Sequence, residues 1–158
     1  MSASLVGSEM CIRDRCFHVT DDMCQIYDSV VTGSIVEVEK QIKNNAVKPL
    51  IDDIPDFNKK CLYTLGAYYS NYYSTPALAI KPLQELMESK QYSIYICEIW
   101  RIWKFISENE VDWLGVPEEE YSAMKIVCLK TILAQIIQHP NDIMAINQFM
   151  QLSLMKYI

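Results

Sequence analysis

Three features of this chain predict an all-α fold, a compact bundle of about six or seven helices. Apolar residues recur at intervals of three and four along most of the 158 residues, which is the period of a helix with one buried face. Prolines and carboxylates precede several of these stretches, as they do at helix starts. Hydrophobic residues make up 51% of the chain, enough for the core of one domain.

The run YSIYICEIWRIWKFI at residues 92–106 is expected to form the central helix. At about 100° per residue, most of its isoleucines and aromatics fall on one broad face. We therefore expect Ile99 and Trp103 to be buried and Lys104, on the opposite side, to be exposed. Trp100 lies outside the main apolar face, so this helix is expected to meet neighbours on more than one side.

Two short helices that meet at Gly33 are expected near the start of the chain. Thr20, followed by two acids, is typical of a helix N-terminus, and Ser34 and Glu37 have the spacing of a second capping box. Together the two helices would form a hairpin. The segment 48–56, which contains two prolines, is expected to be a linker.

A third helix is expected over residues 57–73. Gly66 lies inside it, where glycine costs about 1 kcal/mol relative to alanine unless a close contact requires the missing side chain. Thr75 and Pro76 are typical of the N-cap and first position of the next helix, which is expected to continue to residue 89.

Two further helices are expected after the central one. Pro117 and Glu118–Glu120 begin the first, because proline suits the first turn and acids complement the helix dipole. His139 and Pro140 end it, and Asp142 begins the second. The predicted apolar face of the first helix carries a stripe of Ile126, Leu129, Leu133 and Ile136, with Met124, Val127, Cys128 and Ile132 beside it. The predicted inward face of the second carries Ile143, Ile146, Phe149 and Met150.

A solenoid of stacked helical hairpins is the alternative architecture. Residues 32–38 weakly resemble the turn of an ankyrin unit, and Leu65, Gly66 and Tyr69 match three positions of a tetratricopeptide unit. Neither pattern recurs along the chain, so the bundle is the preferred interpretation.

Residues 1–15 are not expected to take part in the fold. Ser4–Arg15, SLVGSEMCIRDR, resembles the translated adapter sequence found at the ends of proteins predicted from metagenomic sequencing. A genuine flexible leader is the alternative. We expect a single helical domain over residues 16–158, with truncation at either end left open.

The acidic composition narrows the classes of partner. A net charge of −6 disfavours nucleic-acid binding, because no broad basic surface is available for phosphates. No uncharged apolar run approaches the roughly 20 residues of a membrane-spanning helix. The N-terminus lacks the pattern of a secretory signal, so a cytoplasmic location with reduced cysteines is expected.

The sequence predicts no catalytic, cofactor or metal site. Cys11, Cys16, His18 and Cys24 are close in sequence, but their spacing is not that of a zinc knuckle. Phosphate-binding glycine loops and the common hydrolase motifs are missing. The cysteines within apolar helical stretches are interpreted as small core residues; these are Cys61, Cys97 and Cys128.

The leading functional hypothesis is a non-enzymatic helical protein–protein interaction module that binds a protein partner or another copy of itself. Crowded aromatic side chains suggest its contact surface. One alternative is a small acidic immunity or antagonist protein, suggested by size and charge. Another is an enzyme or ligand-binding bundle whose site combines distant Cys, His and Glu residues. The candidate contact residues are Tyr68, Tyr72, Tyr73, Trp100 and Trp113.

Overall fold

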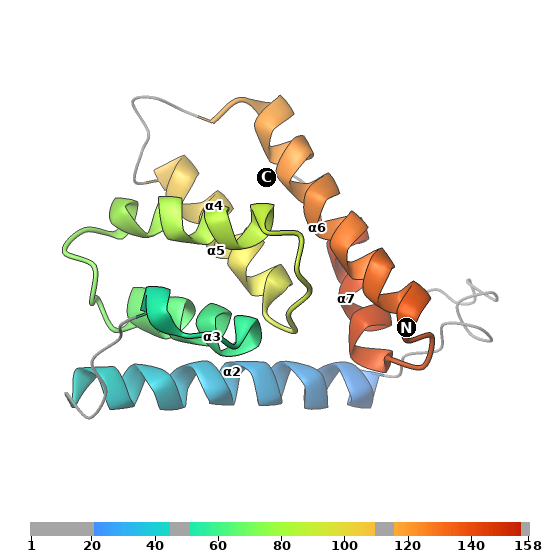
Figure 1. Ribbon diagram of the computed structural model, residues 1–158, viewed down its shortest axis with the longest axis horizontal. Helices are drawn as coiled ribbons and strands as arrows, with labels where there is room; N and C mark the ends of the chain where they lie inside the picture. The colour runs from blue at the N-terminus through green and yellow to red at the C-terminus, as the bar shows by residue number, and fades with distance from the viewer. Residues whose placement is uncertain (1–20, 45–50, 110–115, 156–158) are drawn as a thin grey trace.

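The computed structural model describes residues 21–44, 51–109 and 116–155, and these are helical with no strand among them (Figure 1). The elements are α2 (Asp21–Lys43), η1 (Ile51–Asp53), α3 (Phe57–Tyr69), η2 (Pro76–Ala79), α4 (Ile80–Glu88), α5 (Ile96–Asn109), α6 (Glu118–Gln138) and α7 (Ile143–Leu154). The predicted compact all-α bundle is confirmed.

The helices share one core around α5, which contacts α3, α4 and α6. In addition, α4 contacts α6, which is not its neighbour along the chain. These contacts match a bundle, and they do not follow the strictly sequential stacking of a solenoid. Among the described helices, none combines the length and apolarity needed to cross a membrane.

The predicted hairpin at Gly33 is wrong, because α2 runs through this residue as one helix. Its buried side chains recur every three or four residues on both sides of the glycine, so a single stripe faces α3. Burial of this stripe outweighs the roughly 1 kcal/mol that an interior glycine costs a helix. The buried residues are Val31, Ile35, Val38 and Ile42. The expected N-cap, Thr20, lies outside the described residues.

The contact between α2 and α3 is closest at Gly66. A Cβ atom added to Gly66 would lie 2.5 Å from Cγ1 of Val38, closer than side chains tolerate. Val38, Ile42 and Ala67 form a small apolar cluster beside this contact. The packing explains why a glycine occurs inside α3, since the missing side chain allows the two helix backbones to approach.

Alanine substitutions at the two helical glycines are expected to have opposite effects. Gly66→Ala should destabilise the protein by about 1–3 kcal/mol, because the new methyl group overlaps Val38. Gly33→Ala should stabilise it by about 0.5–1 kcal/mol, because nothing lies within 4 Å of a Cβ there. Urea unfolding followed by circular dichroism measures both changes. A neutral or stabilising Gly66→Ala would contradict the close helix contact.

The start of α3 is confirmed and its predicted end is wrong. Asp56 is the N-cap, and its Oδ1 accepts a hydrogen bond from the Lys59 backbone N–H at 2.8 Å. The helix ends at Tyr69 and does not continue to residue 73. Asn71 adopts a positive φ of 59°, which asparagine tolerates better than most residues, and the chain turns there.

The next helix is divided into η2 and α4. Thr75 is the N-cap of η2 and Pro76 occupies its first turn, as expected. The 3-10 helix changes to an α-helix at Ile80, and Pro82 falls in the first turn of α4, where its missing N–H leaves no helical bond unmade. The prolines therefore mark the starts of the two segments.

The loop before α5 is held by hydrogen bonds to other helices. This helix therefore begins at Ile96 and not, as predicted, at residue 92. The Ser93 hydroxyl donates to Oδ1 of Asn58 at 2.6 Å, and the same oxygen accepts the Ile94 N–H at 3.3 Å. Gln148 of α7 donates its side-chain amide to the Ile94 carbonyl. Side chains of α3 and α7 thus satisfy the backbone N–H and carbonyl groups of the loop, which a first helical turn would otherwise satisfy.

The burial of α5 agrees with the prediction at Ile99 and Trp103 but not at Lys104. Ile99 and Trp103 are buried as expected. Lys104 is only 9% exposed, because its stem packs between α5 and α6. Its Nζ pairs with Glu108 Oε1 at 2.8 Å and lies 5.4 Å from the ring centroid of Tyr121. The charge stays paired although most of the side chain is buried.

The predicted starts of α6 and α7 are confirmed. Pro117 is the N-cap of α6 and Glu118–Glu120 form its first turn. Asp142 caps α7, with its Oδ1 accepting the Ala145 N–H at 3.0 Å. The predicted inward face of α7 is wrong at Ile143, which is exposed, whereas Phe149 of the same face packs against the main core. Polar Asn147 and Gln148 share the buried side with small and apolar residues; the buried set is Ala145, Asn147, Gln148 and Leu152.

Candidate interaction surface

Of the two tryptophans of the predicted contact surface, the structure describes Trp100. Trp100 is 1% exposed, because α5 packs against neighbours on more than one side, and its assignment to a surface is wrong. Trp113 lies outside the described residues. Trp100 and Trp103 of the central helix thus belong to the core, whereas Phe105 of the same helix is 51% exposed.

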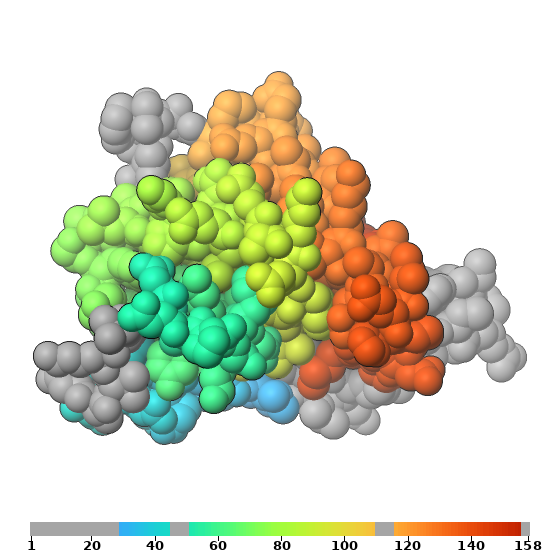
Figure 2. All heavy atoms as spheres, in the orientation of Figure 1, coloured from blue at the N-terminus to red at the C-terminus, as the bar shows by residue number. Residues whose placement is uncertain are grey.

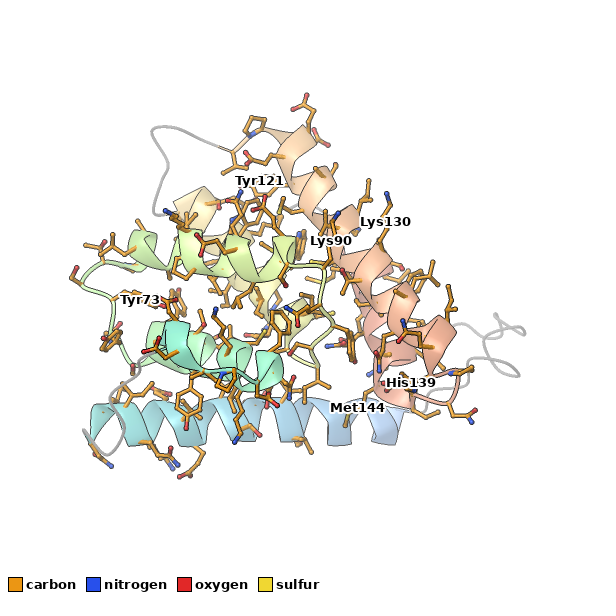
Figure 3. The ribbon with its side chains drawn as sticks, viewed as in Figure 1. Tyr73, Lys90, Tyr121, Lys130, His139 and Met144 are labelled. Carbon is orange, nitrogen blue, oxygen red and sulfur yellow. The ribbon has the colours of Figure 1, made fainter. Side chains whose placement is uncertain are left out.

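The tyrosines after α3 divide between core and surface. Tyr68 and Tyr73 are half-buried and pack against the main core, whereas Tyr72 is 53% exposed. Tyr68 stacks edge-on against Tyr69 with centroids 5.2 Å apart, and Tyr72 against Tyr73 at 5.8 Å. Figure 3 shows Tyr73 beside α3 and α4. Of the three predicted tyrosines, only Tyr72 exposes most of its area.

A larger apolar surface lies on α6, which runs along one flank of the molecule (Figure 2). Its exposed apolar residues, here called the α6 outer stripe, are Ile126, Leu133 and Ile137, with exposures of 49%, 44% and 70%. Leu129 and Ile136 are half-buried against the core. From Ile126 to Ile137 the stripe extends about 16 Å along the helix axis, at 1.5 Å per residue.

The predicted apolar face of α6 is buried only in part, because Met124, Cys128 and Ile132 are buried whereas Ile126 and Leu133 are exposed. The buried residues of α6 are Tyr121, Met124, Cys128, Thr131 and Ile132. At about 100° per residue, the α6 outer stripe lies roughly 140–180° around the helix from Cys128. The sequence pattern shows that apolar residues cover more of the circumference than one core contact requires, but it does not show which part is buried.

Lysines supply the positive charge of α6 beyond its acidic first turn. From residue 121 to residue 138 the charged residues are Lys125 and Lys130. Lys125 donates to the Met155 carbonyl at 2.6 Å, which ties it to the end of α7. Lys130 projects from α6 beside the outer stripe (Figure 3), and the described residues give it no ion pair. The stripe is therefore apolar with one cation at its edge.

Two of the three described cysteines, Cys61 and Cys128, are buried and unsuited to nucleophilic chemistry. Burial raises the pKa of the Cys61 thiol to about 12 and also raises that of Cys128, so both stay protonated at neutral pH. His139 caps α6, its backbone N–H bonding to the Gln135 carbonyl. Within the described residues, no three His, Cys, Asp or Glu side chains are grouped for a metal. The N-terminal cluster Cys11, Cys16 and His18 lies outside them, and the side chain of Cys24 is not described either.

Comparisons with known proteins add no functional information. No protein family, curated protein or solved structure matches this chain.

Proposed function

We propose that this protein is a helical protein–protein interaction module and that the α6 outer stripe is its contact surface. The observation that carries the proposal is the exposure of Ile126, Leu133 and Ile137 along one side of a helix whose opposite side is buried. Water-exposed apolar residues along one side of a helix stabilise a complex when a partner covers them. Their spacing suits an amphipathic helix laid along α6.

The charge on α6 favours a different protein over a second copy. If two copies covered each other's stripes in an antiparallel pair, the twofold axis would cross near Thr131 and Ile132, midway between Ile126 and Ile137. The two Lys130 side chains would then lie about 5 Å apart along the axis, given a rise of 1.5 Å per residue. A parallel pair places them at the same height. Like charges at such an apolar contact oppose association.

The partner that fits this surface is an amphipathic helix with a carboxylate among its apolar residues. Its apolar side chains would cover the stripe, and the carboxylate would face Lys130 at the edge. The contact would exclude water there, and this exclusion strengthens the ion pair. A net charge of −6 on the chain as a whole adds selectivity, because it repels partners that are acidic elsewhere.

A library of helical peptides tests both parts of the proposal. The peptides carry leucine at helical spacing and randomised polar positions, and are selected for binding to the intact protein. Enriched peptides should carry Glu or Asp beside the leucines. Leu133→Asp should weaken their binding at least tenfold, and Lys130→Glu should shift the selection towards Lys and Arg. Leu133→Asp should change stability by no more than about 0.5 kcal/mol, because Leu133 is exposed.

Leu78→Asp is the matched control, since Leu78 is also an exposed leucine, at 56%, but lies in η2. This variant should bind the selected peptides like the unchanged protein. Equal losses of peptide affinity in Leu78→Asp and Leu133→Asp would contradict the assignment of the contact surface to α6. Light scattering that showed a dimer disrupted by Leu133→Asp would replace the helical partner with a second copy.

A further inference from the structure

A cavity of about 490 Å³ lies between α2, α5 and α7, on a different part of the molecule from the α6 outer stripe. Its volume is within the range of pockets that hold small molecules. The lining combines apolar side chains with one acid and one base; the residues used below are Val31, Ile94, Cys97, Glu98, Arg101 and Leu154.

The charged end of the cavity is built from a chain of three side chains. Tyr69 donates its hydroxyl hydrogen to Glu98 Oε2 at 2.6 Å, and Glu98 Oε1 pairs with the Arg101 guanidinium. Burial, followed by the bond to Glu98, raises the pKa of Tyr69, so this donor keeps its proton at neutral pH. Each Glu98 oxygen therefore has a partner within the protein, and Glu98 fixes the position of Arg101.

Arg101 is the member of this chain that remains available to a ligand. Its side chain is 60% exposed, whereas that of Glu98 is 15% exposed. A guanidinium has five N–H donors, and the described hydrogen bond to Glu98 uses one of them. Because the guanidinium is far more exposed than the carboxylate, its remaining N–H donors are the accessible charged group of the cavity, and they favour an anion over a cation.

The rest of the lining suits an apolar ligand body. Val31 and Ile94 contribute apolar wall, and Leu154, which is 76% exposed, contributes apolar surface at the opening. Glu98 offsets much of the Arg101 charge, so an inorganic anion would gain little here. An organic anion adds the burial of its apolar part to the contact with Arg101.

We infer that the cavity between α2, α5 and α7 binds a small organic anion, with its carboxylate, sulfonate or phosphate on Arg101 and its apolar body against Val31, Ile94 and Leu154. Tyr69 and Glu98 act as positioning residues for Arg101. This site is independent of the proposed α6 contact.

Binding of 8-anilinonaphthalene-1-sulfonate tests the site, because this probe has an aromatic body and one sulfonate. Its fluorescence titration on the full chain should give a saturable site, and decanoate should displace it. Arg101→Gln should weaken binding at least tenfold, and Leu154→Ser severalfold. Lys130→Gln and Leu133→Asp on α6 should leave the affinity unchanged, which separates this site from the outer stripe. Far-UV circular dichroism confirms that each variant is folded.

Cys97 provides a second readout, because its thiol lines the cavity. Saturating probe should slow alkylation of Cys97 by iodoacetamide, measured by mass spectrometry of the peptide that contains it. In Arg101→Gln the same probe concentration should protect less. Unchanged probe affinity in Arg101→Gln would overturn the inference, as would Cys97 alkylation at the same rate with and without bound probe.

Discussion

Replacing Trp103 by alanine is expected to lower the free energy of unfolding by about 3–5 kcal/mol. Trp103 is 1% exposed and lies in the helix that holds the core together. Its ring meets the Tyr121 ring edge-on at 5.6 Å between centroids, which joins α5 to α6. Alanine would leave a cavity and remove this contact. Urea unfolding followed by far-UV circular dichroism measures the loss, which is a large part of the stability of an ordinary domain.

Substitution of Lys104, the neighbour of Trp103, tests the effect of a charged side chain that is mostly buried. Because Lys104 packs under Tyr121 and pairs with Glu108, Lys104→Ala should cost about 1 kcal/mol, more than the neutral effect expected of an exposed lysine. Lys130→Ala on the outer side of α6 is the matched control and should be neutral within about 0.5 kcal/mol. Similar small effects from Trp103→Ala and Lys130→Ala would contradict the assigned core face of α5.

The sequence predicted helix starts better than helix ends or continuity. Pro117 and Asp142 were identified as start signals because capping is a local interaction, set by residues within one turn. Gly33 was interpreted as a break, yet the buried stripe of α2 continues past it. The start of α5 depends on Asn58 and other partners far away in sequence, which local signals do not contain.

The contact surface was harder to predict than the fold, for a physical reason. Helical periodicity identifies an apolar face, but α6 has two, and only packing decides which is covered. Trp100 was placed at the surface on the same kind of evidence and is buried. The ion pair between Glu98 and Arg101 is local, because residues three apart lie side by side on a helix. Their link to Tyr69 joins two helices, so no sequence interval indicated it.

Alkaline pH is expected to destabilise the protein steeply, beginning near pH 9. Burial raises the pKa of Cys61 from 9.0 to about 12 and raises that of Cys128 as well. Above pH 9 the unfolded chain releases these protons while the folded chain keeps them, so the folded state binds more protons and stability falls as pH rises. Below pH 9 both states keep them, and this contribution to stability is present in full.

The expected loss is large enough to measure directly. Each thiol contributes up to about 1.4 kcal/mol per pH unit, so the pair accounts for on the order of 5 kcal/mol between pH 9 and pH 11. The buried tyrosines add to the decline above pH 10, where their unfolded forms ionise; burial raises the pKa of Tyr73 to about 12 and also raises those of Tyr69 and Tyr92. Between pH 9 and pH 10 the two thiols therefore account for most of the decline, because the unfolded tyrosines are only partly ionised there.

Urea unfolding at pH 7, 8, 9, 9.5 and 10, with a reducing agent present, measures this dependence. The unchanged protein should show a nearly constant free energy of unfolding up to pH 8 and a clear decline from pH 9 to pH 10. The double variant Cys61→Ala and Cys128→Ala should start lower at pH 7, because two buried side chains are shortened. Its free energy of unfolding should then fall markedly less between pH 9 and pH 10, since the two titrating thiols are gone. An equally steep decline in both proteins would show that these thiols do not hold their protons in the folded core.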